Sequence, residues 1–541
     1  MTPVERNRLW LAAAAALVLL GAALRLHHLG FQELWLDETL QLRMATTDRL
    51  AEALRLEYSP PLGYLLWRGW VQAFGESEVA LRALAAIFGI LCVPVVIAAG
   101  RTLFSPAAGL WAGLFAAVAP LQIYYSQEAR SYSLLCLALA LCHWTLWRAL
   151  LRPRPAAWAA FSASACLALF THHFAALALF PALLVAWRQR GFYVAAAAAG
   201  LPWAAWIGWS WLVNTQIVRG YQWVTALWNA IPPALAIPKS FEALAFGPQQ
   251  GSIPGFFKQF TVLAFPPALR WGGVLALAAL CAVALSPWHD GEDARRRKAW
   301  LAAVVLFPLA AFWTASWWVP IYVVARYDLV AFPGLVLLVG QGLAKLRGLA
   351  RGLAAPALAA LFFGVIGAKL ALYYTLPPFA AGPAPSRDSA AVIDAVAAEG
   401  DLVVLSVYRG ATVGYYLRRL GYREADGRFE SPSGRSFTLR RLPTHPSSLF
   451  FNVDHPERPR FDLEQTRLDL RGYLAQLDPA RATVWLEVLP ELPRLPQFRK
   501  LLAEELARAG WCEAPLPPGL APGHVTPYRA GCGVPGTRSG A

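Results

Sequence analysis

VALRALAAIFGILCVPVVIAA, residues 79–99, decides the fold class of this chain. The stretch carries one charged residue, Arg82, and is otherwise apolar apart from glycine and proline. The hydrocarbon core of a bilayer is about 30 Å thick and a helix rises about 1.5 Å per residue, so about 20 mostly apolar residues are needed to cross it. The stretch therefore predicts a membrane-spanning helix.

Runs of this kind recur through the first two thirds of the chain, and they predict eleven spanning helices. The predicted spans are residues 9–26, 79–99, 107–125, 132–151, 156–170, 172–187, 192–213, 269–285, 299–318, 327–343 and 353–372. The fifth and sixth spans are short, which favours tilted or shifted helices.

The composition excludes several classes of protein. Hydrophobic residues make up 57% of the 541 residues and charged residues 15%, against about 25% charged in typical soluble proteins. Mean hydropathy is +0.43. A soluble globular enzyme, a disordered chain and a fibrous protein are therefore excluded. The net charge of +15 comes from short basic clusters between apolar runs, which indicates membrane topology rather than nucleic-acid binding.

The basic clusters also predict the orientation, because lysine and arginine accumulate in cytoplasmic loops. They occupy every second loop of the eleven-span arrangement: Arg6 and Arg8, Arg101, Arg148 with Arg152 and Arg154, Arg188 and Arg190, residues 295–298, and Lys345 with Arg347 and Arg351. We therefore predict a multi-pass protein of the inner (cytoplasmic) membrane, with a cytoplasmic N-terminus and an extracytoplasmic C-terminal tail.

Three segments have alternative interpretations. The first span resembles a secretory signal, but its apolar run is long for one. Residues 60–74 are apolar, but they are too few to span and would reverse the parity of every later loop, so they predict an interfacial helix. Residues 214–270, rich in proline, glycine and aromatic residues, predict a large outer loop.

Beyond the membrane segments, residues 1–375, a linker at 376–387 leads to a polar domain at 388–541. Predicted helices at 388–399, 411–420 and 499–509 alternate with predicted strands at 401–407 and 482–489, which favours a small α/β domain. Cys512 and Cys532 are the only cysteines in this domain, and one disulfide between them is possible.

Unusual polar residues gather at the outer ends of the predicted spans. The loop at residues 27–78 contains LWLDETLQ, and later loops contain YYSQEARSY, FTHHF and VARYDL. The residues concerned are Asp37, Glu38, Glu57, Gln127, Glu128, Arg130, His172, His173, Arg326 and Tyr327. Carboxylates and arginines at the hydrocarbon edge cost free energy unless they are paired or wetted, so the cluster predicts an outward-facing cavity.

Each of these residues also has a simpler interpretation. Asp37 and Glu38 suit a solvated helix start, Arg130 and Arg326 suit anchors to lipid phosphates, and the adjacent histidines suit a helix end at the interface. Together they suit group transfer from a lipid-linked phosphate donor, because carboxylates can accept a proton and arginines can bind phosphate. No nucleotide-binding or metal-ligand motif is present in the sequence.

Six motifs occur in the order found in one family of enzymes. They are LWLDE, SPPLGYLLWRGW, FGESEVALRALAAIFGILCVP, PLQIYYSQEARSYSLL, THHFAAL and ARYDLVAFPGLVLL. In these motifs the chain resembles bacterial GT-C membrane glycosyltransferases of the protein-mannosyltransferase-like and aminoarabinose-transferase-like group. The resemblance implies transfer of a sugar from a polyprenyl-phosphate donor with inversion of the anomeric centre.

By that resemblance, Asp37 is the catalytic base and Glu38 orients Asp37 or the acceptor. Arg130 and Arg326 match positions near the donor phosphate, and Glu128 and Tyr132 belong to the same motif. Ser59, His172 and Tyr327 are further candidates for substrate contact. The family usually has histidine where Ser59 stands and often an aromatic residue at Gly63, so this chain can differ in substrate or activity. Some members use a divalent metal, but this sequence has no metal signature of its own.

The sequence therefore predicts an integral membrane glycosyltransferase with a small C-terminal extracytoplasmic α/β domain. Its expected partners are a polyprenyl-phosphate-linked sugar donor, membrane lipids, and a lipid, glycan or protein acceptor; no cofactor and no nucleic acid are expected. Two alternatives stay open. A flippase for lipid-linked sugars would place charges along a path through the membrane, and a catalytically inactive envelope-assembly protein would not need Asp37 and Glu38.

Overall fold

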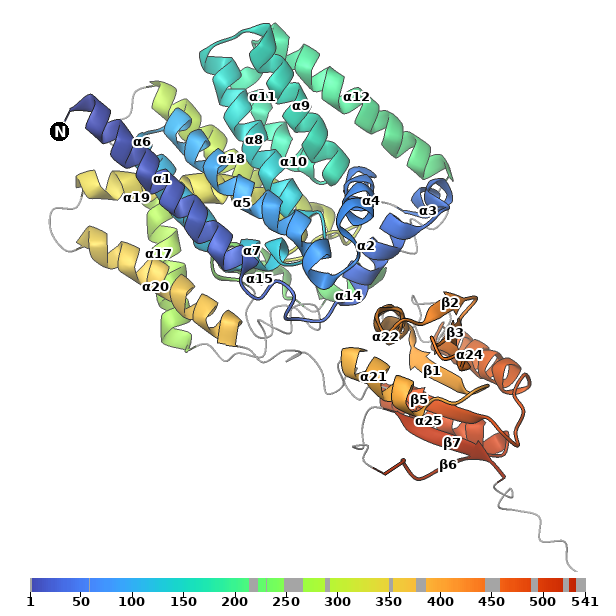
Figure 1. Ribbon diagram of the computed structural model, residues 1–541. Coiled ribbons are helices and arrows are strands. Elements are labelled where there is room, and N and C mark those ends of the chain that lie inside the picture. Colours follow the sequence, from blue (N-terminus) through green and yellow to red (C-terminus); the bar gives the residue numbers. More distant parts are fainter. Residues whose placement is uncertain are drawn as a thin grey trace, which may run out of the picture. The chain divides into compact units, whose positions relative to one another are not determined.

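The computed structural model describes residues 2–57, 59–213, 222–229, 231–247, 266–287, 292–349, 354–375, 386–442, 458–487, 495–518 and 525–531. Its contacts divide the chain into two units (Figure 1). The first consists of Met1–Phe31 and Gln41–Pro377, and the second of Gln32–Leu40 and Pro378–Ala541. A short piece of the first predicted outer loop thus belongs with the C-terminal domain, which the sequence does not predict.

The described part of the first unit is built from helices. They are α1 Pro3–Leu26, α2 Leu36–Thr46 (which begins in the second unit), α3 Leu50–Leu56, α4 Leu62–Phe74, α5 Glu78–Leu103, α6 Pro106–Val118, α7 Pro120–Ser126, α8 Tyr132–Leu151, α9 Pro155–Thr171, α10 Ala175–Leu179, η1 Phe180–Ala182, α11 Leu183–Ala186, α12 Arg190–Val213, α14 Gln222–Asn229, α15 Pro233–Phe246, α17 Pro267–Leu285, α18 Glu292–Ala315, η2 Tyr327–Ala331, α19 Phe332–Leu349 and α20 Ala354–Thr375.

Helices are present at all eleven predicted spans, but not all of them reach the length needed to cross a membrane. Among the described residues, eight helices are long and apolar enough to cross a membrane, or nine if the bent pair α6 and α7 forms one span. The other two predicted spans coincide with shorter apolar helices, Pro155–Thr171 and Ala175–Ala186, which fall below the usual crossing length of about 20 residues. The chain is a multi-pass membrane protein. The predicted interfacial segment forms α4, which is too short to span.

Small residues let the membrane helices approach closely. A Cβ added to Gly100 of α5 would lie 2.8 Å from the Cα of Gly109 in α6. One added to Gly340 of α19 would lie 2.7 Å from the carbonyl oxygen of Ala108, and one at Gly342 would overlap the backbone of α17. Contacts of this kind hold helices together in lipid, where burial of apolar surface contributes little.

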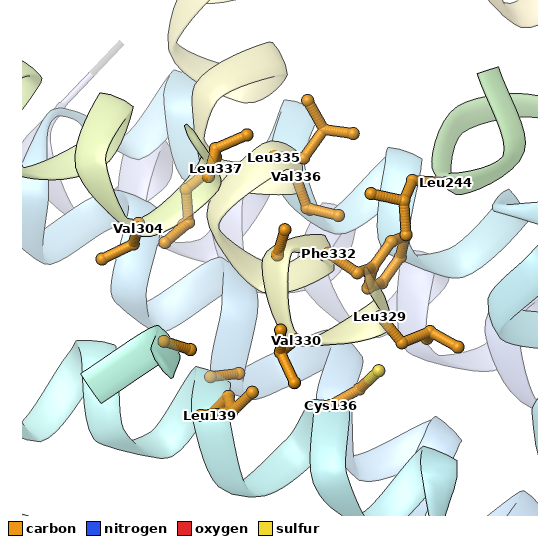
Figure 2. Close-up of a cluster of buried hydrophobic side chains, with 14 of the residues drawn as sticks. Cys136, Leu139, Leu244, Val304, Leu329, Val330, Phe332, Leu335, Val336 and Leu337 are labelled. Atoms are coloured by element: carbon orange, nitrogen blue, oxygen red, sulfur yellow. The ribbon is translucent and has the colours of Figure 1, made fainter. Parts of the chain in front are cut away.

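The segment η2–α19 runs through the centre of the first unit. The candidate span here is Tyr327–Leu346, and 83% of its most apolar 18-residue stretch is buried. The corresponding stretch of α1 is only 11% buried. Figure 2 shows Val330 and Phe332 among side chains of neighbouring helices, including Leu139 of α8 and Leu244 of α15. Arg326 immediately precedes this buried segment, so the packing carries its side chain into the interior, where it is 5% exposed.

A buried arginine stabilises the bend between α6 and α7, which turn by 59°. Pro120 has no N–H, so the carbonyl of Ala116, four residues earlier, has no helical donor. Arg25 of α1 supplies one: its guanidinium donates to the carbonyls of Ala116 at 2.7 Å and Ala117 at 2.9 Å, and to the side chain of Gln122. The fully buried Arg25 therefore replaces the missing helical hydrogen bonds.

The second unit contains a seven-stranded sheet with the order β2-β3-β4-β1-β5-β7-β6. β1 pairs in parallel with β4 and β5, and the other pairs are antiparallel. The elements are α21 Ser386–Val396, β1 Leu402–Ser406, α22 Val407–Arg419, β2 Arg423–Ala425, β3 Arg428–Glu430, β4 Ser436–Leu442, α24 Arg458–Leu474, β5 Thr483–Glu487, α25 Leu495–Arg508, β6 Trp511–Glu513 and β7 Thr526–Ala530.

Helices cover both faces of this sheet. Leu402 and Val404 of β1 pack with Leu470 of α24 and Leu502 of α25 in one cluster, while the intervening strand residue Val403 points to the face of α22. The predicted helices and strands of the domain correspond to α21, α22, α25, β1 and β5.

The cysteines follow two patterns. Cys512 of β6 is disulfide-bonded, and its predicted partner Cys532 lies outside the described residues. The other five are free thiols: Cys92, Cys136, Cys142, Cys166 and Cys281.

Candidate functional site

A pocket in the first unit brings together predicted site residues from four separate motifs. Its volume is about 40 Å³. The lining residues are Gln41, Ser59, Pro60, Gly63, Tyr64, Arg130, Ser131, Tyr132, Thr171, His172, Arg326 and Tyr327. Residues nearly 200 positions apart, Arg130 and Arg326, therefore share one cavity.

A strained turn holds Arg326. Ala325 has a φ of 64°, a conformation that costs free energy for a residue with a Cβ. The carboxylate of Asp328 stabilises this turn by accepting the N–H of Ala325 at 3.0 Å. Arg326 Nε donates to the hydroxyl of Tyr132 at 2.5 Å, and the guanidinium carbon lies 5.4 Å from the centre of the Tyr132 ring. The arginine is thus held in one orientation against the wall of the pocket.

Arg130 lies in the turn between α7 and α8, and the neighbouring Gln127 anchors that turn. The amide nitrogen of Gln127 donates to the carbonyls of Arg25 at 3.1 Å and His27 at 2.7 Å, at the end of α1. Its amide oxygen accepts a hydrogen bond from Tyr373 of α20 at 2.6 Å. The turn is therefore attached to two other helices, which limits the positions open to Arg130.

His172 follows the last residue of α9. Its Nδ1 accepts the backbone N–H of Phe174 at 3.2 Å, which leaves Nε2 to carry the ring proton. The ring can therefore donate a hydrogen bond from Nε2.

Of the remaining predicted residues of the first unit, some line the pocket and others do not. Ser59 and Tyr327 line the pocket. Glu128 is 3% exposed but lies outside the lining. His173 accepts the indole N–H of Trp203 at 3.2 Å and is also outside it.

Two further lining positions involve close contacts around α4. Glu57 accepts the hydroxyl of Tyr64, a lining residue, at 2.9 Å. A side chain at Gly63 would collide with the hydroxyl of Ser131, so the two lining residues pack closely here.

Asp37 and Glu38 form the first turn of α2 and belong to the second unit. Asp37 is half-buried and Glu38 is 1% exposed. A Glu38 carboxylate oxygen accepts the backbone N–H of Trp35 at 3.3 Å, a long bond that satisfies one of the free amides at a helix start. Gln41, which lines the pocket, was not predicted; its position four residues after Asp37 in one helix was the available signal.

Comparison with solved structures gives the fold a name. Over 99% of its length the chain matches all of the crystal structure of ArnT from Cupriavidus metallidurans bound to undecaprenyl phosphate, with a TM-score of 0.52 and 14% identity. The apo form of the same protein matches over 98% of this chain and 99% of that one, again with a TM-score of 0.52 and 14% identity. The chain has the GT-C fold.

A family model also matches part of the sequence. Residues 58–209 of this GT-C chain match the family model of dolichyl-phosphate-mannose-protein mannosyltransferases. The matched segment contains Ser59, Arg130, Tyr132 and His172 of the pocket lining. No curated protein sequence matches the chain.

Among the residues that the structure describes, no group of three or more histidine, cysteine, aspartate or glutamate side chains is arranged to hold a metal ion. The positive charge lining the pocket of this GT-C chain comes from Arg130 and Arg326.

Proposed function

We propose that the chain is a membrane glycosyltransferase that moves a sugar from a polyprenyl-phosphate-linked donor to an acceptor hydroxyl. The observation that carries this proposal is the convergence of Arg130 and Arg326 on one pocket beside Tyr132 and His172. The GT-C fold and the match to a mannosyltransferase family support it.

The pocket suits a phosphate group better than it suits a neutral ligand. Two guanidinium groups can form charge-assisted hydrogen bonds with phosphate oxygens, and the Nε2–H of His172 can add a further donor.

The proposed base is Asp37. Asp37 belongs to the second unit and is not among the residues that line the pocket. Its proposed role as the base rests on its place in LWLDE, the first motif of the family that the chain resembles. The neighbouring Glu38 is proposed to orient this turn through its bond to Trp35.

The proposed reaction is an in-line displacement. The acceptor oxygen bonds to the anomeric carbon while the bond from that carbon to the phosphate oxygen breaks, and the acceptor proton passes to the Asp37 carboxylate. The bonding electrons leave with polyprenyl phosphate, whose charge Arg130 and Arg326 stabilise. Attack opposite the leaving group inverts the anomeric centre. Ser59, Glu128 and Tyr327 are proposed to assist binding.

The proposed orientation puts this reaction at the outer face of the cytoplasmic membrane. It rests on the basic loops, which the positive-inside rule assigns to the cytoplasm. A sugar that arrives linked to a lipid on that face needs no nucleotide, which agrees with the sequence having no nucleotide-binding motif.

The test is sugar transfer in membranes carrying the parent chain or Asp37→Asn. Donors with a labelled sugar on polyprenyl phosphate are added, and label is measured in lipid, glycan and protein fractions. Transfer by the parent and its loss in a normally expressed Asp37→Asn variant would support the proposal. Movement of intact donor across the bilayer without transfer would replace it with the flippase hypothesis, and neither activity with any donor would favour an assembly protein.

A further inference from the structure

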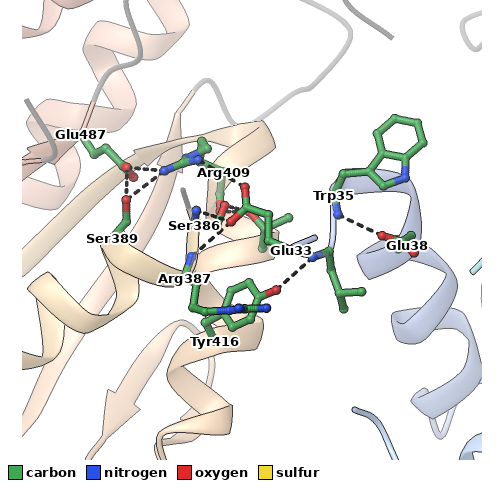
Figure 3. A network of polar contacts seen from close by, with 11 residues as sticks. Glu33, Trp35, Glu38, Ser386, Arg387, Ser389, Arg409, Tyr416 and Glu487 are labelled. Atoms are coloured by element: carbon green, nitrogen blue, oxygen red, sulfur yellow. Dashed lines mark hydrogen bonds and ion pairs between the residues drawn. The ribbon is translucent and has the colours of Figure 1, made fainter. Parts of the chain in front are cut away.

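The C-terminal domain binds the chain segment that leads into α2, and Glu33 is the main contact. One carboxylate oxygen of Glu33 accepts the backbone N–H groups of Ser386 at 2.5 Å and Arg387 at 3.2 Å (Figure 3). These amides belong to the first turn of α21, where helix N–H groups have no partner within the helix. Glu33 therefore caps a helix that begins more than 350 residues later.

A buried ion-pair chain connects Glu33 with the centre of the sheet. The other Glu33 oxygen lies 4.0 Å from Arg409 of α22. Arg409 also pairs with Glu487 of β5 at 2.9 Å and donates to the hydroxyl of Ser389 at 2.8 Å. Glu487 is 2% exposed and Arg409 is 9% exposed. Removing the charge of Arg409 or of Glu487 would leave the other charge buried without its partner, which costs free energy.

The backbone next to Glu33 is bound as well. The N–H of Leu34 donates to the hydroxyl of Tyr416 at 2.9 Å, and both residues are buried. The next residue, Trp35, donates its backbone N–H to Glu38 at the start of α2 (Figure 3). Glu33 and Leu34 are therefore bound to the C-terminal domain, and Leu34 precedes Asp37 by three positions.

Because Glu33 and Leu34 are bound, the position of the next few residues is restricted as well. Adjacent Cα atoms are about 3.8 Å apart, and the helix that begins at Leu36 leaves little freedom between Leu34 and Asp37. From the geometry we propose that the C-terminal domain positions the base Asp37, with Glu33, Arg409 and Tyr416 as positioning residues. This inference rests on the proposed function.

The test compares four variants of the full-length protein in lipid nanodiscs with the parent chain. Glu33→Leu removes both the charge and the amide acceptor, Glu33→Gln keeps a carbonyl acceptor, and Tyr416→Phe removes only the hydroxyl. The matched control is Tyr422→Phe, because the Tyr422 hydroxyl donates to Asp394 at 2.7 Å elsewhere in the same domain. Amide hydrogen exchange of residues 33–40 and the kcat and donor KM of transfer are measured for each.

Faster exchange of residues 33–40 is expected in Glu33→Leu and Tyr416→Phe, with Glu33→Gln intermediate. kcat should fall about 10-fold to 100-fold in Glu33→Leu while the donor KM stays within about twofold, because misplacement of a catalytic group by about 1 Å can cost that much. Tyr422→Phe should match the parent in both measurements.

Two outcomes would overturn the inference. Unchanged exchange in Glu33→Leu and Tyr416→Phe would show that these contacts do not hold the segment. Faster exchange with an unchanged kcat would show that the attachment has no part in positioning Asp37. If the parent transfers no sugar from any donor, the proposed function and the positioning role both fail, while hydrogen exchange still reports separately whether the segment is attached.

Discussion

Arg326 and Tyr132 are joined by a hydrogen bond of 2.5 Å between Nε and the phenol oxygen, although 194 residues separate them in the chain. The bond uses the Nε–H of the guanidinium group, and both residues line the pocket. Tyr132 is the first residue of α8 and Arg326 precedes η2, so the bond also connects two membrane segments. It makes the orientation of Arg326 depend on Tyr132.

Loss of this bond should weaken donor binding. We expect Arg326→Gln to raise the donor KM by about 10-fold to 100-fold, because a hydrogen bond to a charged group contributes about 1.5–3 kcal/mol. Tyr132→Phe should have a smaller effect in the same direction, since it keeps the charge and loses only the orientation. Steady-state kinetics with purified enzyme measures both. A parent-like KM in Arg326→Gln would remove this arginine from the donor site.

The two adjacent carboxylates should differ in their effect on turnover. Asp37→Asn should lower kcat by about 100-fold to 10,000-fold, the usual contribution of general base catalysis. Glu38→Gln keeps an oxygen that can accept the N–H of Trp35, so a loss of less than about 10-fold is expected. A larger loss in Glu38→Gln than in Asp37→Asn would transfer the role of base to Glu38.

Close packing at Gly342 should make it intolerant of a larger side chain. A Cβ there meets the backbone of α17, which cannot rotate away, so Gly342→Ala should cost about 1–3 kcal/mol. The matched control is Gly364→Ala, because a Cβ at Gly364 has nothing within 4 Å. Thermal unfolding in detergent should show a lower Tm for Gly342→Ala and no decrease for Gly364→Ala. Equal Tm values would show that α17 and α19 can separate freely.

The bend between α6 and α7 should depend on Arg25. Arg25→Met leaves the carbonyls of Ala116 and Ala117 without these donors, and each unsatisfied buried group costs about 1–3 kcal/mol. A clear fall in Tm is expected for Arg25→Met. Arg25→Lys should be intermediate, because one ammonium group cannot reproduce the fork of a guanidinium. A parent-like Tm in both variants would mean that other groups satisfy these carbonyls.

The membrane helices could be predicted because their cause is local. The bilayer sets a minimum length for an apolar run, and each run can be recognised without knowledge of its neighbours. In the C-terminal domain, β1 (LVVLS) was predictable for the same reason. β4 (SFTLRRL) and β7 (TPYRA) were not, because their polar residues suit a place inside the sheet only once the partner strands on both sides are known.

By itself, then, the sequence determined a multi-pass helical protein with a small α/β domain, and it marked polar residues at the ends of the predicted spans. Only the tertiary structure decided which of them meet. It joined Arg130, Tyr132, His172 and Arg326 in one pocket, and it attached Glu33 to α21 of the C-terminal domain. Such contacts join residues hundreds of positions apart, where no helical or strand periodicity relates them, so packing of the whole chain is what brings them together.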